Sequence, residues 1–113
     1  MLRSLRLDSA VDGEYFIGMF DSSGLIIGRI GIKQTSDRDK TWIISWCEGR
    51  GMLPNFRKFL EFAKANMVEN LIMYARTQGM AVWAIRSGWI MSRERCDLRW
   101  GIYFSYRLTD GRF

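Results

Sequence analysis

The sequence predicts a single α/β domain spanning residues 1–113, with a mixed, mostly antiparallel sheet and two packed helices in the order β-β-β-α-β-α-β-β. The chain is 48% hydrophobic and 14% aromatic over 113 residues, which suits one packed domain. Its N-terminal third is rich in strand-forming residues separated by turns, and a strand–helix–strand segment follows. Together these patterns favour a sheet with helices packed on it.

Three strands are predicted in the N-terminal third. Residues 15–20 and 25–33 are strand-like, and Asp21-Ser22-Ser23-Gly24 between them begins with Asp and ends with Gly, as many turns do. The two stretches therefore form an antiparallel hairpin. Residues 41–47 (TWIISWC) make a third strand of high strand propensity. Glycines inside these strands suggest bulges or close backbone approach, at Gly18, Gly28 and Gly31.

An amphipathic helix follows the third strand. Apolar residues recur at steps of three and four, at Phe56, Phe59, Leu60, Ala63 and Met67. Pro54 suits the first helical position and Asn70 is a plausible end. Residues 71–75 (LIMYA) read as a short buried strand. Because a helix separates this strand from 41–47, the two should pair in parallel.

A second helix and a closing hairpin complete the predicted order. One helical face carries Met80, Trp83, Ala84 and Ser87, and Gly88 ends the helix. Residues 89–94 and 99–108 are strand-like, with 95–98 as their turn. The alternation in the last strand predicts one buried face, formed by Trp100, Ile102, Phe104 and Tyr106.

The composition excludes several kinds of site. The chain has no histidine, so a Ser-His-Asp triad, a Cys-His pair and imidazole-based zinc sites are excluded. The two cysteines, Cys47 and Cys96, lie far apart and outside any CxxC motif, so we expect reduced thiols and no metal site. Cys47 lies in an apolar strand and is predicted to be a small core residue.

The charge of +5 is concentrated near the C-terminus, because residues 76–113 carry seven basic and only three acidic side chains. All seven basic residues are arginines. Arginine suits phosphate, although a solvated surface explains the same pattern. We expect no nucleic-acid partner, since no recognised motif accompanies this modest charge. No signal peptide and no run of about 20 apolar residues is visible. We therefore expect a cytoplasmic protein without a membrane partner.

The loop between the third strand and the first helix is a candidate anion site. Gly49 and Gly51 lie where a strand leads into a helix, and this geometry points backbone N–H groups into a shared crevice. A plain strand–loop–helix connection explains the same glycines equally well.

Over roughly residues 14–108 the chain resembles a minimal member of the GNAT superfamily, the N-acetyltransferases that use acetyl-CoA. The resemblance is carried by the DSSG hairpin, the strand WIISWC, the loop EGRGML with its helix, and the segment LIMYARTQGMAVWAIRSGWIMSRE. This segment ends in Gly88-Trp89, where the family has a Gly-Phe pair.

The resemblance implies an N-acyltransferase with acetyl-CoA in a V-shaped opening between the third and fourth strands. The pyrophosphate would lie on backbone N–H groups at the helix start, which maps to Arg50, Gly51, Met52, Leu53, Asn55 and Phe56. The acceptor amine is unknown. Glu48 is the carboxylate placed to act as general base, and Tyr74 on the neighbouring strand as the acid. A solvated carboxylate and a core aromatic are the simpler alternatives for these two residues.

A second interpretation is a catalytically inactive GNAT-like interaction or structural module. The loop lacks the family's second glycine, and Ala84 stands where the family often has a tyrosine that protonates the departing thiolate. Small GNAT-like domains occur among phage-encoded proteins, so a virion or host-interaction protein is the analogous case. Five tryptophans and the arginine-rich hairpin suit a protein partner or a second copy.

Overall fold

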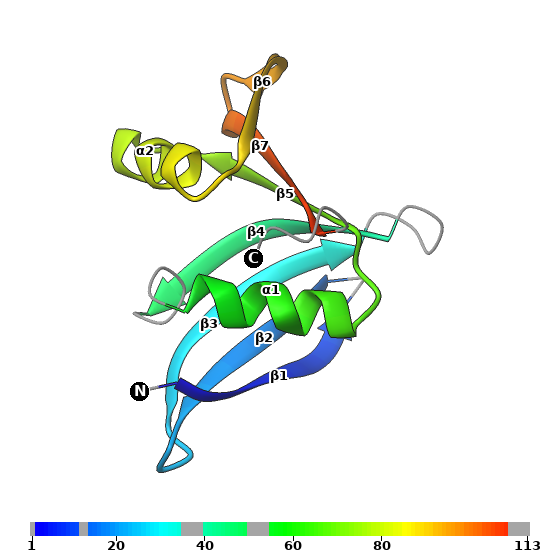
Figure 1. Cartoon of the computed structure of the whole chain (residues 1–113), viewed down its shortest axis with the longest axis vertical. Coiled ribbons are helices and arrows are strands. Elements are labelled where there is room, and N and C mark those ends of the chain that lie inside the picture. The colour runs from blue at the N-terminus through cyan, green and yellow to red at the C-terminus, as the bar shows by residue number, and fades with distance from the viewer. Residues whose placement is uncertain (1, 12–13, 35–39, 50–54, 109–113) are drawn as a thin grey trace.

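The computed structural model describes residues 2–11, 14–34, 40–49 and 55–108. Within these residues the chain forms one seven-stranded sheet, with spatial order β1-β2-β3-β4-β5-β7-β6, and two helices (Figure 1). From residue 14 to residue 107 the elements follow the predicted order β-β-β-α-β-α-β-β, so the predicted fold class is confirmed.

The N-terminal strands form an antiparallel meander. β1 (Leu2–Val11), β2 (Glu14–Asp21), β3 (Ile26–Gln34) and β4 (Thr41–Gly49) pair in sequence order. The three predicted strands are confirmed as β2, β3 and β4, whereas β1 is an additional edge strand that sequence patterns did not predict.

The turn between β2 and β3 is organised by one carboxylate, as its DSSG sequence predicts. Asp21 accepts hydrogen bonds from the Ser23 hydroxyl (2.6 Å), the Ser23 N–H (2.9 Å) and the Leu25 N–H (3.0 Å). The bond from the Ser23 hydroxyl is the largest influence that lowers the pKa of Asp21. Gly24 completes the turn with a φ of 85°, a conformation that favours glycine.

Helix α1 (Phe56–Ala65) is shorter than predicted. Its buried residues Phe59, Leu60 and Ala63 lie at helical spacing, as expected. Met67 was wrongly placed on this face: it lies beyond the helix with a φ of 65° and is 70% exposed. The left-handed turn brings Val68 into the core instead, and its N–H donates to the Ala63 carbonyl. Pro54 lies outside the described residues.

The second half contains β5 (Asn70–Ala75), α2 (Gln78–Arg86), β6 (Ile90–Asp97) and β7 (Gly101–Arg107). β5 runs parallel to β4, as predicted for a strand–helix–strand crossover. α2 begins at Thr77, whose hydroxyl accepts from the Met80 N–H at 3.2 Å.

The closing hairpin differs from its prediction at the turn. The turn is at residues 98–100 and not 95–98, because β6 makes an irregular bulge between Ser92 and Asp97. As a result Trp100 is 49% exposed, contrary to the predicted buried face. Tyr103, from the opposite face of β7, is buried against Tyr74.

Both helices cover the same face of the sheet. Phe62 of α1 contacts Trp42 of β4, and Phe56 of α1 contacts Trp83 of α2 with ring centroids 5.0 Å apart. Under the helices lies the core, whose largest fully buried side chains are Phe59, Phe104, Ile17, Met19, Ile30, Ile32, Leu60, Leu71 and Leu108. Most of this cluster lies on strands β2, β3, β5 and β7.

Backbone hydrogen bonds join three segments where β4 and β5 begin. The Lys40 carbonyl accepts from the Glu69 N–H at 2.8 Å and from the Asn70 N–H at 3.3 Å. The Glu69 carbonyl in turn accepts from the Leu108 N–H at 2.8 Å, and the Lys40 and Glu69 side chains form an ion pair at 3.6 Å. We call this junction of residues 40, 69 and 108 the vertex.

Candidate functional site

β4 and β5 pair only near the vertex and then separate. Their parallel register runs from Thr41 opposite Asn70 to Ile44 opposite Met73, although β4 continues to Gly49. At the same point β4 has a bulge: Ile44 pairs with Ile32 and Trp46 with Gly31, so Ser45 has no partner in β3. The bulge turns β4 away from β5 and opens a V in the sheet, visible in Figure 1.

The structure places Glu48 and Tyr74 on the sheet face opposite the helices. Glu48 pairs with Arg29 of β3, and Ile43 pairs with Lys33 of the same strand. Arg29 and Lys33 are four residues apart and so lie on one face, which means that Glu48 and Ile43 also share a face. Ile43 pairs with Ile72 of β5, and strand alternation puts Tyr74 on the face of Ile72. The two predicted residues therefore share a face, on the two strands that separate.

Glu48 forms an ion pair with Arg29, and both side chains are about half exposed, at 50% and 47%. They line an open cavity of about 550 Å³ together with Ile26, Ile27 and Gly28. The ion pair holds the carboxylate near the end of β4. Its exposure keeps it in contact with water.

Tyr74 is half-buried and lies against a second tyrosine. Its ring meets Tyr103 of β7 edge-to-face at 5.5 Å. Arg95 donates from Nη1 to the Tyr103 hydroxyl at 3.1 Å, and its guanidinium lies 5.5 Å from the Tyr103 ring. Thus an arginine–tyrosine–tyrosine row crosses the face on the β5 side of the V.

On the helix face, only part of the predicted cofactor cradle lies in the described chain. Arg50, Gly51, Met52 and Leu53 lie outside the described residues. Asn55 precedes α1 and makes no capping hydrogen bond through its side chain, and no acidic residue occupies the first turn. Phe56 is the first helical residue. The start of α1 therefore has the positive end of the helix dipole without a carboxylate to offset it.

A cluster of four aromatic residues joins the start of α1 to α2, and sequence analysis did not predict it. The Phe56 ring lies 5.0 Å from Trp83, 5.8 Å from Trp89 and 5.6 Å from Tyr106. Trp89 also meets Tyr106 at 5.5 Å. We call these four residues the aromatic cluster. Its one sequence signal is tryptophan after the helix-ending Gly88.

Cys47 lies in the part of β4 that has left β5, and it is exposed where a core position was predicted. It pairs with Ile30 on the helix face of the sheet. Desolvation of the sulfur nevertheless raises the pKa of the Cys47 thiol to about 11. At neutral pH the thiol is protonated, which does not suit a nucleophile.

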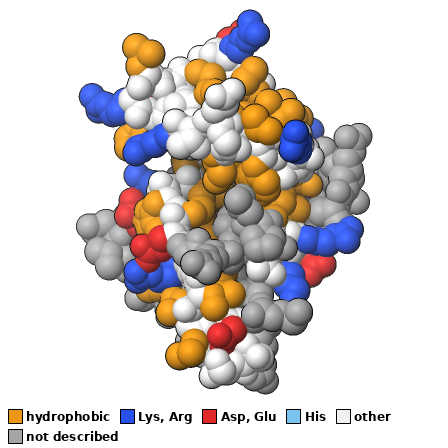
Figure 2. All heavy atoms as spheres, turned by 90° about the vertical axis from the view of Figure 1, so that its left-hand side faces the viewer, with side chains coloured by type: hydrophobic (Ala, Val, Ile, Leu, Met, Phe, Trp, Pro, Cys, Tyr) orange, Lys and Arg blue, Asp and Glu red, His pale blue; other side chains and the backbone are white. Residues whose placement is uncertain are grey.

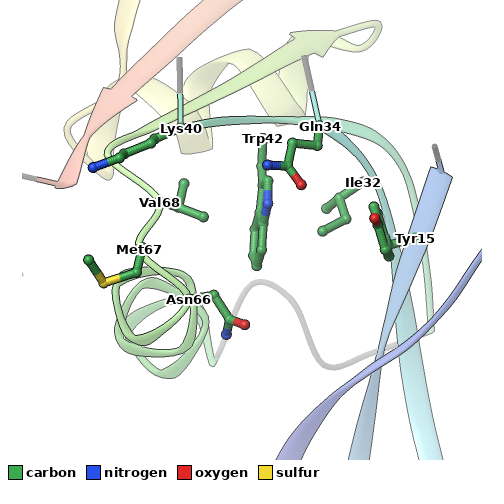
Figure 3. A pocket seen from close by; sticks show the side chains of 8 residues that line it. All are labelled: Tyr15, Ile32, Gln34, Lys40, Trp42, Asn66, Met67 and Val68. Carbon is green, nitrogen blue, oxygen red and sulfur yellow. The ribbon is translucent and has the colours of Figure 1, made fainter. Parts of the chain in front are cut away.

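A further cavity of about 260 Å³ lies at the other end of α1 (Figure 3). Trp42 and Asn66 project toward it, and Ile32 and Tyr15 form its opposite wall. It is smaller than the usual ligand cavity of about 300–1,000 Å³. Because its wall includes residues beside the vertex, it is separate from the mouth of the V.

Two other kinds of site find no support in the part of the chain that the structure describes. Among those residues, no three His, Cys, Asp or Glu side chains gather in a way that could hold a metal ion. No described helix is both long and apolar enough to cross a membrane.

The chain was compared with known proteins. No protein-family model matches it, and no curated protein does. Solved acetyltransferase structures do match. A GNAT-family acetyltransferase from Staphylococcus aureus Mu50 aligns at 11% identity and a TM-score of 0.59, covering 85% of this chain and 68% of that one.

Two further structures match at similar levels. Tetrahymena GCN5 aligns at 16% identity and a TM-score of 0.63, covering 87% of this chain and 70% of that one. A chimera of spermidine N-acetyltransferase SpeG from Vibrio cholerae and hSSAT aligns at 7% identity and a TM-score of 0.66, covering 88% and 69%. Such identities establish fold alone, and the resemblance noted in the sequence is confirmed at that level: the chain has the fold of the GNAT acetyltransferases.

Proposed function

We propose that this protein is an acyl-CoA-dependent N-acyltransferase that binds acetyl-CoA at the V between β4 and β5. The observation that carries the proposal is the V itself: the strands pair at only four positions and then separate, with the start of α1 on the helix face. Solved acetyltransferases share this fold across most of the chain. The helix start supplies N–H groups for the pyrophosphate, with Arg50, Gly51, Met52, Leu53, Asn55 and Phe56 as the cradle.

In the proposed reaction an amine nitrogen attacks the thioester carbonyl. A C–N bond forms, the C–S bond breaks, and CoA leaves as a thiolate. Glu48 takes the proton that the amine loses, directly or through one water, and the Tyr74 hydroxyl donates a proton to the thiolate. Their common face supports these roles, because both side chains then lie on one side of the sheet, on the two strands that separate.

The first experiment tests cofactor binding by thermal shift and calorimetry with acetyl-CoA. A ligand at 100 times its Kd stabilises the folded state by about 2.7 kcal/mol, which is easily seen as a higher melting temperature. Arg50→Glu should weaken binding by placing a negative charge in the cradle. Arg93→Glu is the matched control, because it changes the net charge equally on the exposed part of β6. Absence of a shift at millimolar acetyl-CoA would refute the proposal.

The second experiment tests the catalytic assignments with a panel of amines. Glu48→Gln should lower kcat by at least tenfold with little change in acetyl-CoA affinity, since a general base contributes about 10²–10⁴-fold. Glu61→Gln, which removes an exposed carboxylate from α1, is the control. Tyr74→Phe should lower kcat similarly while Tyr15→Phe should not. Equal rates in Glu48→Gln and the wild type would remove Glu48 from the mechanism.

A non-catalytic interaction module is the second candidate, and exposed apolar side chains favour it. Val82 and Ile85 on α2 are 41% and 60% exposed, and Ile90 on β6 is 66% exposed. Figure 2 shows hydrophobic side chains gathered across the middle of the face seen from the left of Figure 1. Under this alternative the protein would bind a partner or a second copy and show no acetyl-CoA effect. Sedimentation at several concentrations separates the second-copy case.

A further inference from the structure

The Trp89 indole N–H is a buried donor without an acceptor in the described structure. Trp89 is 4% exposed, and its Nε1 has no hydrogen-bond partner among the residues that the structure describes. Leaving such a donor unpaired costs about 1–3 kcal/mol. Buried polar groups are paired in the great majority of cases, so this exception calls for an explanation.

The surroundings of Trp89 explain why the donor is unpaired. Trp89 belongs to the aromatic cluster, with ring centroids 5.8 Å from Phe56, 5.5 Å from Tyr106 and 6.5 Å from Trp83. The one oxygen among the side chains of the cluster, the Tyr106 hydroxyl, is not a hydrogen-bond partner of Nε1, and the ring π faces are weak acceptors compared with an oxygen. A phenylalanine would keep much of the same packing without an unpaired N–H, and phenylalanine is what the GNAT resemblance places after Gly88.

This donor belongs to a ring that lies beside the start of α1, which is part of the proposed cofactor site. Phe56 is the first residue of α1, and Trp89 contacts its ring directly. The buried N–H and the start of α1, which carries no acidic residue in its first turn, therefore belong to one neighbourhood on the helix face. Two independent features there are suited to oxygen acceptors of a ligand.

We propose that the Trp89 indole N–H donates a hydrogen bond to an amide carbonyl oxygen in the pantetheine arm of acyl-CoA. This inference rests on the proposed acyl-CoA site. The pantetheine arm is uncharged, and a neutral carbonyl can enter an aromatic cluster at modest cost. A phosphate oxygen would bring negative charge into apolar surroundings, at a much greater cost. The donor is thus matched to the arm and not to the nucleotide.

Binding requires a ring to move, because Nε1 is closed off from solvent in this structure. Phe56 is only half-buried, so its ring can turn aside with less loss of packing than Trp89 or Tyr106 would suffer. The emission spectrum of the tryptophans should therefore change when the ligand binds. The unpaired N–H gains its partner at the same step, which offsets part of the packing lost.

The experiment compares Trp89→Phe with Trp83→Phe by calorimetry. Both variants make the same truncation in the same cluster, but Trp83 is not a buried unpaired donor in the described structure. Trp89→Phe should weaken acetyl-CoA binding by about five- to tenfold, the value of one hydrogen bond. Trp83→Phe should change the Kd by less than twofold. S-acetylpantetheine, which lacks the nucleotide, should show the same five- to tenfold loss.

NMR of the ¹⁵N-labelled wild-type protein gives a second measurement that needs no folded variant for its readout. The Trp89 indole N–H signal should move downfield when S-acetylpantetheine binds, more than the other indole signals do. An unchanged Kd in Trp89→Phe, or an unmoved indole signal, overturns the inference while acetyl-CoA binding by the wild type leaves the proposed function standing. A loss seen with acetyl-CoA but not with the fragment overturns the carbonyl assignment. A wild type that binds neither ligand overturns both proposals.

Discussion

The two arms of the V, which are the strands and helix on either side of it, differ in the side chains that they bury. The N-terminal arm, β1–β4 with α1, has a largely aliphatic core in which Ile17, Ile30 and Ile32 are fully buried. In the C-terminal arm, β5–β7 with α2, the helix buries only Ala81 and Ala84. Nearly every residue of β6 is exposed. The helix of the second arm therefore covers its strands with smaller buried side chains than the helix of the first arm does.

The C-terminal arm is stabilised by packing against a residue of the N-terminal arm. Trp83, Trp89 and Tyr106 of that arm pack on Phe56, which comes from the other arm. The aromatic cluster therefore packs within the second arm and also joins the two arms. Perturbing it should loosen the second arm more than the first.

The largest expected effect comes from Phe56→Ala. Removing a ring that contacts four others should destabilise the protein by about 3 kcal/mol, within the range for Phe→Ala in cores. Hydrogen exchange should show amides of β6 and β7 losing protection before those of β2 and β3. Phe62→Ala is the control, since Phe62 contacts Trp42 within the first arm. If Phe56→Ala lowered amide protection equally in both arms, the proposed difference between the arms would be wrong.

The next effect concerns the turn that closes the second arm. Gly101 has a φ of 111°, and a Cβ there would overlap the Ala75 carbonyl oxygen. Gly101→Ala should therefore destabilise by about 2 kcal/mol through backbone strain and steric overlap. Gly79→Ala, in α2 with open space around its Cα, should instead stabilise by about 0.5–1 kcal/mol. Urea unfolding measures both, and equal effects would contradict the structure.

A smaller effect, confined to chemistry at the mouth of the V, is expected for Cys47. A pKa of about 11 instead of 9.0 lowers the thiolate fraction at pH 8 about a hundredfold. In a Cys96→Ser background, alkylation of the folded protein should be slower than that of the urea-unfolded chain by this factor. The folded state retains its proton between pH 9 and 11 while the unfolded state loses it, so the thiol's contribution to stability falls as pH rises through that window. Alkylation at the same rate in both states would refute the assigned pKa.

The smallest effect is expected at the β2–β3 turn of the first arm. Asp21 has a lowered pKa because the Ser23 hydroxyl and two backbone N–H groups stabilise its charged form. Its contribution to stability is therefore present above the ordinary pKa of 3.8 and is lost as the pH falls below that value. The melting temperature of the wild type should exceed that of Asp21→Asn at pH 6, and the difference should shrink toward pH 2. A difference independent of pH would contradict this role.

Local patterns in the sequence predicted most of the fold. The DSSG turn, the helical spacing of Phe59, Leu60 and Ala63, and the crossover to residues 71–75 depend on neighbours in sequence, and each is confirmed. β1 was not predicted because the alternation of leucines with polar residues in its sequence is weak. This segment forms a strand by pairing with β2. The β6–β7 turn was misplaced because a bulge, which sequence periodicity does not encode, shifts the register.

The candidate site was predictable only in part. Glu48 and Tyr74 could be assigned to the ends of neighbouring strands, but their common face depends on the bulge at Ser45, which a plain alternation would not include. The aromatic cluster joins residues 56, 83, 89 and 106, which are distant in sequence and meet through the topology of the sheet. Burial of the Trp89 N–H follows from that meeting, so no local pattern could have indicated it.

The vertex has a mechanical consequence for the V. Gly49 lies five residues beyond Ile44, the last residue of β4 paired with β5, so the tip of β4 extends about 16 Å from its point of attachment. At that lever length a rotation of about 10° about the attachment moves the tip by about 3 Å. The hydrogen bonds among residues 40, 69 and 108 restrain such rotation from the opposite end. The width of the V at the tip of β4 is therefore restrained at its far end, by the β4–β5 pairing and the backbone hydrogen bonds of the vertex.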